Sequence, residues 1–349
     1  MLAQQATTGI DVWLFTLREL TSAAQAEAAR VGVNLATSRL QRFQTLSRAG
    51  ARDVERLRPD IVHFHSVYVP GHAQLSHLLR RLGIPYVISP HGGLHLWRSQ
   101  RKKAMYAALV EKPHFRGAEV ILVLTERERR LIGAWLGGHD GPRRSEIVPN
   151  SIRPLPTQAW QWRSPEQRRL VYLGRFDVWA KGLDRLVAIA GHLPDAEVIA
   201  YGTASGAEQQ AFVRLCRSGL SPNMRFHDPV YNDQKFAALA EASIYVQLSR
   251  DEGFGMSIVE AMRQGVPTAV TEGCDIVDVI RDRDLGLVVP DDPARAAETV
   301  ATSLRDPERL RHWSRAGQEW TRAELSPKNV ADRVIAIYDS VIRAPGAAT

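Results

Sequence analysis

The sequence predicts an α/β protein in which each half of the chain forms a doubly wound parallel sheet. First, short β-branched runs alternate with longer stretches of helical periodicity throughout the 349 residues. Second, prolines cluster near residues 150–166 and divide the chain into two halves of ordinary domain size. Because parallel sheets bind ligands at the carboxyl ends of their strands, we expect functional residues in the turns that follow the strands.

Strands are expected where apolar, β-branched runs are bounded by turn residues, and helices fill the intervals. The expected strands lie at residues 10–15, 61–65, 85–89, 119–124, 146–149, 169–173, 196–201, 223–227, 243–248, 267–270 and 286–289. The chain is therefore predicted to hold a first domain at 1–155 and a second at 156–326. A terminal helix is expected within 327–349, and the resemblance described below implies that it returns to the first domain.

The composition favours a cytoplasmic protein. A hydrophobic fraction of 44% is enough for real cores, and Cys216 and Cys274 are the two cysteines. Two cysteines make neither a disulfide framework nor a thiolate metal cluster, and they suit a reducing compartment. No apolar run approaches the roughly 18–20 residues that span a bilayer.

Charge is distributed unevenly between the halves. Residues 1–155 hold 22 basic and 12 acidic residues, whereas residues 156–349 hold 23 and 26. The densest basic stretch, within 97–116, has the pattern of an amphipathic helix with aromatic anchors. It suits the anionic inner face of the cytoplasmic membrane, although a solvated helix face has the same pattern. No nucleic-acid-binding signature is present, so we expect no nucleic-acid partner.

Two carboxylates stand out in the second half. The expected strand 243–248 is followed by a glycine-bearing turn that contains Glu252, and Glu260 lies in the helix after it. A helix that starts at such a turn presents backbone N–H groups and a positive helix end to an anion. Two structural alternatives stay open: Glu252 could be a solvated loop residue, and Ser257 with Glu260 has the spacing of a capping box.

Two cations follow another strand of the same half. Arg175 and Lys181 lie in the loop between the expected strand 169–173 and a helix with apolar residues at helical spacing. Arginine can grip a diphosphate with its fork of donors, and lysine acts as a point charge. The alternative is that both cations are simply exposed.

Together these motifs resemble the GT-B glycosyltransferases, specifically the large retaining family 4 group. Glu252 and Glu260 match that family's pattern of two glutamates separated by seven residues. Val87 to Leu94, with His91, is similar to its strand-end His-Gly turn, and Ile147 to Ile152 to its Pro-Asn turn. Pro59 to His65 is similar to its Asp-Val-Val-His-x-His strand, and the likeness covers roughly residues 10–345. The family implies two Rossmann-like domains that face a central cleft.

The resemblance also implies roles for individual residues. Arg175 and Lys181 would neutralise the diphosphate of a nucleotide-sugar donor, and Glu260 would accept from its ribose hydroxyls. Glu252 would hold the sugar hydroxyls, and His91 would contact the sugar near its C6 end. The predicted donor-binding residues are Gly174, Gly202, Val230, Gly253, Phe254, Gly255 and Glu260.

The implied reaction is transfer of a hexose from a UDP- or GDP-sugar, with retention, to a glycan or lipid-linked acceptor in exopolysaccharide or lipopolysaccharide synthesis. Two alternatives are an impaired or non-catalytic nucleotide-sugar-binding homologue and another GT-B enzyme, such as a sugar-nucleotide epimerase. No cofactor is expected, because the nucleotide sugar is a substrate.

No metal site is expected. His63 and His65 share a strand face, but no third ligand accompanies them at a convincing spacing, and Gly92 and Gly93 argue against a chelating helix around His91 and His95. Asp282-Arg-Asp284 matches the Asp-x-Asp pattern of metal-dependent transferases, but we expect this segment to form a turn.

The beginning of the chain departs from the family pattern. In the family, the first strand ends in a Gly-rich loop that faces the donor phosphates. Residues 2–17 instead resemble the end of the helix after that loop and the second strand. We therefore expect the first sheet to lack its first strand and the loop.

Overall fold

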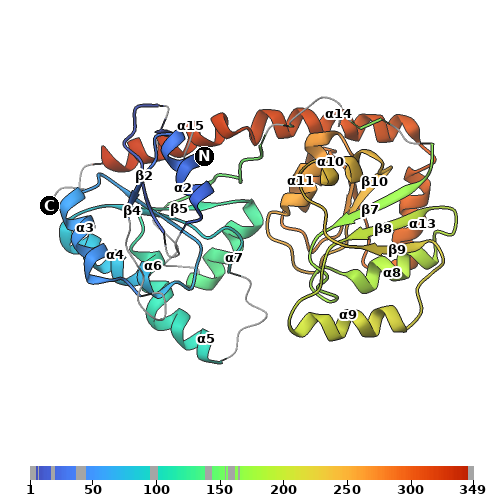
Figure 1. Ribbon diagram of the computed structural model, residues 1–349, viewed down its shortest axis with the longest axis horizontal. Helices are drawn as coiled ribbons and strands as arrows, with labels where there is room; N and C mark the ends of the chain where they lie inside the picture. The colour runs from blue at the N-terminus through green and yellow to red at the C-terminus, as the bar shows by residue number, and fades with distance from the viewer. Residues whose placement is uncertain are drawn as a thin grey trace. The chain divides into compact units, whose positions relative to one another are not determined.

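The computed structural model describes residues 5–6, 8–16, 20–36, 45–94, 101–137, 144–153, 155, 162–163 and 166–344. The chain forms two compact units, coloured along the chain in Figure 1. Unit 1 comprises Met1–Ser151 with Pro327–Thr349, and unit 2 comprises Ile152–Ser326. Each contains parallel strands with helices between them, so the predicted α/β class with two Rossmann-like domains is confirmed.

Unit 2 contains a six-stranded sheet in the order β12-β11-β10-β7-β8-β9, and every neighbouring pair is parallel. Its strands are β7 (Arg169–Leu173), β8 (Glu197–Tyr201), β9 (Met224–His227), β10 (Ile244–Gln247), β11 (Thr268–Val270) and β12 (Leu287–Val288). The chain builds outward from β7 to β9, then returns to the other side of β7 with β10. The strand order therefore reverses between β7 and β10, where open α/β sheets bind ligands beyond the strand ends.

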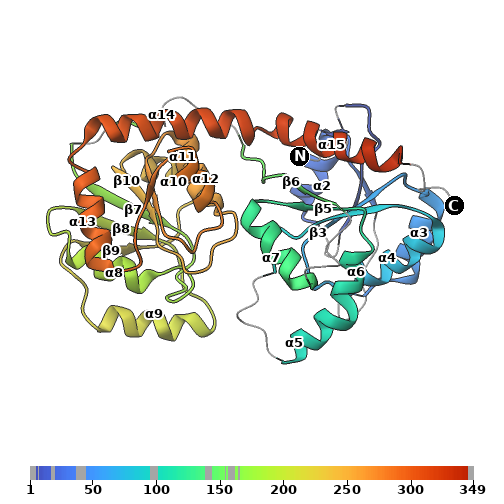
Figure 2. The same cartoon turned by 180° about the vertical axis from the view of Figure 1, so that it is seen from behind.

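Helices cover both faces of this sheet (Figures 1 and 2). They are α8 (Leu183–Gly191), α9 (Ala207–Arg217), α10 (Asn232–Ala240), α11 (Met256–Gln264), α12 (Val277–Asp282), α13 (Pro293–Ser303) and α14 (Pro307–Glu324). All four residues of β10 are buried, because the strand lies inside the sheet with helices on either side. Such a strand must be apolar or must pair its polar groups internally.

Unit 1 holds its strands in two hydrogen-bonded groups. The strands are β1 (Trp13–Phe15), β2 (Asn34–Ala36), β3 (Val62–His65), β4 (Tyr86–Ser89), β5 (Val120–Val123) and β6 (Ser145–Ile147). β1 pairs with β2, and β3 to β6 form a four-stranded sheet in chain order. β2 was not predicted, because its three residues open with a polar asparagine and show too short an apolar run.

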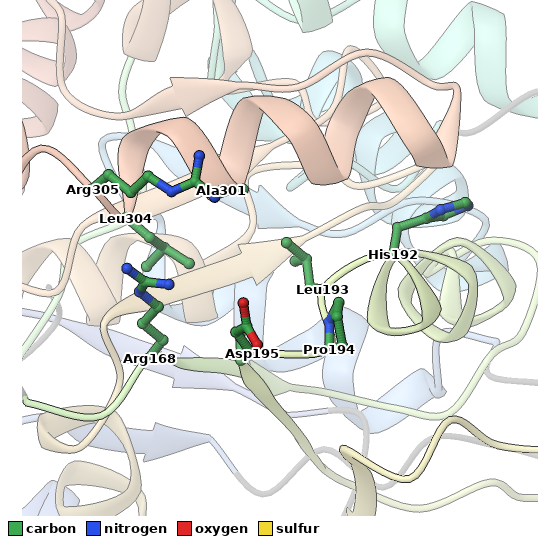
Figure 3. A pocket seen from close by; sticks show the side chains of 9 residues that line it. Arg168, His192, Leu193, Pro194, Asp195, Ala301, Leu304 and Arg305 are labelled. Atoms are coloured by element: carbon green, nitrogen blue, oxygen red, sulfur yellow. The ribbon is translucent and has the colours of Figure 1, made fainter.

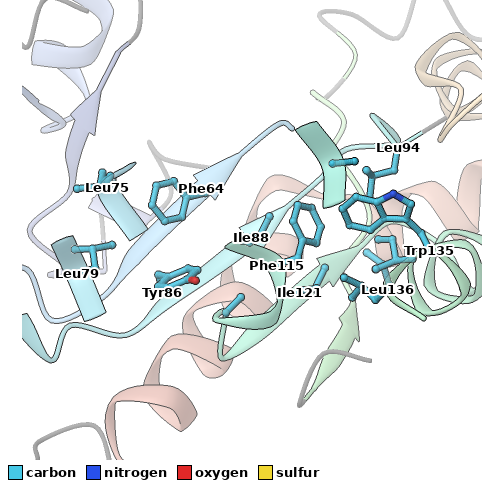
Figure 4. Packing of buried hydrophobic residues seen from close by; sticks show 14 of the residues in the cluster. Phe64, Leu75, Leu79, Tyr86, Ile88, Leu94, Phe115, Ile121, Trp135 and Leu136 are labelled. Carbon is cyan, nitrogen blue, oxygen red and sulfur yellow. The ribbon is translucent and has the colours of Figure 1, made fainter. Parts of the chain in front are cut away.

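Unit 1 has the helices α2 (Ser22–Arg30), α3 (Arg48–Leu57), α4 (Pro70–Leu82), α5 (Arg101–Tyr106), α6 (Lys112–Arg116), α7 (Glu126–Leu136) and α15 (Pro327–Ile342). One face of the four-stranded sheet packs against α4, α6 and α7 through aromatic and aliphatic side chains, as Figure 4 shows for Phe64, Tyr86, Phe115 and Trp135. The opposite face packs against α15, where Val334 is completely buried. The last helix therefore completes the core of unit 1.

The basic stretch predicted as one amphipathic helix is more complex. α5 and α6 are joined by a π-helical turn, η2 (Ala107–Glu111), so the helix is irregular at its centre. Met105 and Leu109 are exposed there. Residues 97–100, which begin the predicted stretch, lie outside the described residues. Among the described residues, no helix combines the length and apolar character needed to cross a membrane.

Candidate functional site

The turns after β7 and β8 meet at the carboxyl edge of the unit 2 sheet. A Cβ added at Gly202 would lie 1.8 Å from the carbonyl oxygen of Gly174. The buried Tyr172 donates its hydroxyl to the carbonyl of Arg175 at 2.8 Å, which holds the backbone of the turn. Two predicted donor-binding glycines are thus brought together, and Arg175, which follows Gly174, is exposed.

Lys181 and Glu252 form an ion pair. The Lys181 Nζ lies 2.8 Å from the Glu252 Oε2, and both side chains are mostly buried. Gly182, which follows the lysine, has φ +67°, and a Cβ there would lie 2.0 Å from the carbonyl oxygen of Leu248. The close approach of these two loops explains how residues 71 positions apart come into contact.

The backbone around Glu252 is also fixed. Its N–H donates to the carbonyl of Gly273 at 3.0 Å, and its own carbonyl accepts from the N–H of Asp275 at 2.9 Å. The structural alternative of a solvated loop acid is therefore wrong. Glu252 is a largely buried residue, held by backbone contacts and paired with a cation.

The turn after Glu252 opens α11. Gly255 is the N-cap residue with φ +69°, and Phe254 is buried. Gly253 lies between Glu252 and Phe254, so the predicted run of backbone N–H groups precedes the helix N-terminus, where partial positive charge favours an anion. Val230 follows β9 and therefore lies at the same edge of the sheet.

Glu260 lies in the second turn of α11 and pairs with Lys235 of α10, with 2.7 Å between Nζ and Oε1. The capping-box alternative is wrong, because the N-cap is Gly255 rather than Ser257. The Ser257 hydroxyl instead lies 2.8 Å from the hydroxyl of Tyr245. Sequence reasoning missed Lys235, since nothing in the sequence links it to a glutamate 25 positions away.

A cavity of about 150 Å³ lies at the opposite end of the same sheet (Figure 3). Arg168 and Asp195 line it, and these residues precede β7 and β8. Because they stand at the amino ends of the strands, this cavity is separate from the predicted donor-binding residues at the carboxyl ends.

In unit 1, His91 follows β4 in a left-handed conformation with φ 54°. Its Nδ1 lies 3.0 Å from Asn150 Oδ1, and its Nε2 lies 2.9 Å from His65 Nδ1. Both bonds are satisfied when His91 carries its proton on Nδ1 and accepts from His65 at Nε2. Both ring nitrogens are therefore engaged, and a side-chain contact with a sugar would replace one of these bonds.

The turn that holds His91 is anchored by Glu128 of α7. This buried carboxylate accepts from the N–H of Gly92 at 2.8 Å and from that of Leu124 at 2.6 Å. Thr125 and Glu128 have the spacing of a capping box, and Thr125 does cap α7. The sequence could therefore have revealed the helix start, but not the contact with Gly92.

The neighbouring histidines are held in neutral form. Burial is the main cause that lowers the pKa of His65 to about 4 and the pKa of His63 well below its ordinary value. Burial also lowers the pKa of His91, although its bond to Asn150 opposes the shift. His63 bonds the hydroxyls of Tyr338 and Ser89, at 2.5 and 2.7 Å, through its two nitrogens.

Within the described residues, no group of three or more histidine, cysteine, aspartate or glutamate side chains has the arrangement of a metal site. The rings of His63 and His65 stack at 4.0 Å between centroids. His95 lies outside the described residues. Asp284 lies in a turn with φ 50° and accepts from Arg309 at 2.8 Å.

Comparisons with known proteins identify the family of both units. Residues 156–320 match the family model of the glycosyl transferases group 1, and residues 1–151 match that of the glycosyl transferase 4-like domain. A phosphatidyl-myo-inositol mannosyltransferase of Mycobacterium leprae is 29% identical over 180 residues, or 50% of this chain and 47% of that protein.

A GDP-mannose:cellobiosyl-diphosphopolyprenol alpha-mannosyltransferase of Xanthomonas campestris is 24% identical over 252 residues, or 70% of this chain and 64% of that protein. The chain thus spans less than two thirds of the length of these two relatives. The solved structure of a sucrose-phosphate synthase from Thermosynechococcus elongatus has a TM-score of 0.76 at 17% identity, covering 99% of this chain and 92% of that one. Together, the family models over both units and the shared fold show that the chain belongs to the group 1 glycosyltransferases of the GT-B fold.

Proposed function

We propose that this glycosyltransferase moves a hexose, with retention, from a UDP- or GDP-sugar to a glycan or lipid-linked acceptor in cell-surface polysaccharide synthesis. The observation that carries the proposal is the Lys181–Glu252 ion pair, which joins the loop after β7, where Arg175 also lies, to the loop after the neighbouring strand β10, which leads into the helix of Glu260. Two cations suit a diphosphate, and two carboxylates suit the hydroxyls of a sugar and a ribose.

Each residue has a distinct task in this reaction. The bond from the anomeric carbon to the diphosphate breaks, and negative charge grows on the departing phosphate. Arg175 and Lys181 stabilise that charge, which is the largest contribution in most sites of this kind. Glu252 holds the sugar hydroxyls, Glu260 accepts from the ribose, and His91 contacts the sugar. A phosphate oxygen of the leaving group takes the proton of the attacking acceptor hydroxyl.

A donor panel tests the proposal directly. Isothermal titration with UDP and GDP identifies the base, and incubation with the matching sugar nucleotides identifies the sugar. NMR of the product should show the same anomeric configuration as the donor. Nucleotide binding without transfer to any acceptor or water would instead favour the impaired, non-catalytic homologue.

The proposed reaction uses neither a metal ion nor a cofactor. Arg175 and Lys181 provide positive charge that a divalent ion supplies in other transferases. Activity should therefore survive EDTA. Complete loss of activity with EDTA and its recovery with Mn²⁺ would contradict this part of the proposal.

The acceptor is proposed to reach the enzyme at the inner face of the cytoplasmic membrane. The names of both relatives include a lipid or a polyprenol. Met105 and Leu109 are 61% and 71% exposed in the basic segment 97–116, which suits contact with anionic lipid. Cosedimentation with phosphatidylglycerol vesicles, but not with phosphatidylcholine vesicles, should occur and should weaken in the Met105→Ser/Leu109→Ser variant.

A further inference from the structure

Gln247 is a buried amide beside the predicted sugar-binding carboxylate. It is the last residue of β10, and only 1% of its surface is exposed. Burial of an amide among apolar residues is unfavourable unless its donors and acceptor are satisfied. A strand interior could hold an aliphatic side chain here instead, so the contacts that satisfy this amide need an explanation.

The two ends of the amide have different partners. Its Nε2 donates to Glu252 Oε2 at 3.1 Å and to Ser249 Oγ at 2.7 Å. Its Oε1 accepts from the hydroxyl of Tyr245 at 2.6 Å. The reverse orientation would place the amide oxygen against a carboxylate oxygen, where neither can donate, so the charge of Glu252 fixes the amide.

Lys181 approaches the same carboxylate oxygen, with its Nζ 2.8 Å from Oε2. Oε2 therefore accepts from an ammonium, an amide and, at 3.5 Å, the hydroxyl of Ser249, while the described residues provide no hydrogen bond to Oε1. Three donors that converge on one oxygen, with the amide of Gln247 bonded to both Ser249 and Glu252, hold the carboxylate plane in a single orientation. The other oxygen is then available to a ligand.

We propose that Gln247 is a positioning residue that orients Glu252, so that Oε1 accepts from a hydroxyl of the donor sugar. This inference rests on the proposed function, because it deepens the role given to Glu252. Tyr245 extends the arrangement, since its hydroxyl contacts Ser257 in the first turn of α11 at 2.8 Å. The buried network thus links the carboxylate to the helix whose N-terminus faces the same edge.

Gln247→Met removes the hydrogen bonds and keeps a similar volume. We expect kcat for sugar transfer to fall about tenfold to hundredfold, the scale of a small misplacement of a reacting group. Binding of the free nucleotide diphosphate should change little, because that ligand has no sugar. An unchanged kcat in this variant would overturn the inference.

Gln247→Glu gives a signature that a merely structural residue would not. Two carboxylates at this distance cannot both ionise readily, so the pair retains a proton. In that form the new carboxyl donates to Glu252 and replaces the amide. The ratio of variant to wild-type kcat should therefore rise as the pH falls from 8 to 5.5, whereas the ratio for Gln247→Met should stay flat. Flat ratios for both would count against the inference.

Gln264 provides a matched control. It is also fully buried, lies in the same unit, and donates to the carbonyl of Phe236 rather than to Glu252. Gln264→Met should lower the melting temperature about as much as Gln247→Met does, yet leave kcat near the wild-type value. Equal losses of kcat in the two variants would show that Gln247→Met acts through general destabilisation and not through the orientation of Glu252.

A crystal structure of Gln247→Met makes the test independent of activity. The Glu252 carboxylate should turn from its present orientation or occupy two orientations, and an unchanged single orientation would overturn the inference. If Glu252→Gln abolishes transfer while Gln247→Met does not, the inference fails and the proposed function stands. If no donor is turned over by the wild type, the proposed function fails and the crystal structure still decides the role of Gln247.

Discussion

The two units place different chemistry at their strand ends. Unit 2 gathers charged side chains that are paired with each other, as in Lys181 with Glu252 and Lys235 with Glu260. Unit 1 gathers histidines whose pKa values burial lowers, so they are neutral at physiological pH. Under the proposed function, unit 2 would stabilise the charge of the diphosphate, and unit 1 would offer uncharged hydrogen-bonding groups.

The largest expected effect comes from removing the cations of unit 2. Arg175→Ala and Lys181→Ala should each lower kcat/KM. The fall should correspond to a loss of about 2–4 kcal/mol of transition-state stabilisation, the scale of losing one charge-stabilising donor. Steady-state kinetics with the identified donor measures this. Near-wild-type kcat/KM in both variants would contradict the role of these two cations in stabilising the leaving diphosphate.

The same two variants should differ in stability. Arg175 is exposed, so its removal should leave the melting temperature unchanged. Removal of Lys181 leaves the largely buried Glu252 without its counter-charge, so Lys181→Ala should lower the melting temperature. The double variant Lys181→Ala/Glu252→Gln should recover part of the loss.

The next effect is steric and tests whether close loop packing holds the charges in place. Gly182→Ala places a Cβ against the Leu248 carbonyl at a left-handed φ, which should destabilise unit 2 by about 1–3 kcal/mol. Gly191 is the control, since a Cβ there has nothing within 4 Å and the residue ends α8. Gly191→Ala should be neutral or slightly stabilising in urea denaturation.

The two glutamates should separate binding from turnover. Glu260→Gln should mainly raise the donor KM, because a ribose contact is the same in the ground and transition states. Glu252→Gln should mainly lower kcat, because it holds the sugar on which charge changes. If both variants changed the donor KM and kcat in the same way, the two glutamates would not have the separate roles that the resemblance implies.

The smallest effect is a pH dependence that arises from the buried histidines of unit 1. The pKa of His65 is lowered to about 4, from an ordinary value near 6.5. The unfolded chain therefore binds a proton that the folded unit does not, so stability is full above pH 6.5 and falls as the pH decreases towards 4. His65→Asn should reduce the decline in melting temperature without abolishing it, because burial also lowers the pKa of His63, His72 and His114.

Sequence reasoning succeeded where a signal is local. Apolar runs bounded by turns located the strands of both units, apart from β2 with its three residues. Sequence reasoning could not predict the contacts of the candidate site, because they join residues far apart in the chain. Lys235 meets Glu260, and Glu128 meets Gly92, only once the helices and strands have packed.

Gln247 illustrates a second reason why the sequence alone did not reveal the candidate site in full. In the sequence it is one polar residue in an otherwise apolar strand, and periodicity cannot distinguish a tolerated polar residue from one with a task. The π turn was equally hidden, since hydrophobic spacing is averaged over a window longer than the five residues of that turn. Burial and hydrogen-bond partners, which only the fold supplies, carry this information.

The π turn at Ala107–Glu111 makes the length of this segment matter as much as its composition. Such a turn equals an α-helix with one residue inserted, so it changes the angular register between the flanking helices. Glu111 is thereby buried and accepts from the N–H of Tyr68 at 2.8 Å, at a residue with φ 58°. A homologous chain shorter by one residue here could keep all the other side chains and a continuous helix, yet turn its carboxylate away from that loop. Insertions and deletions, more than substitutions, would then determine how the loop after β3 is held.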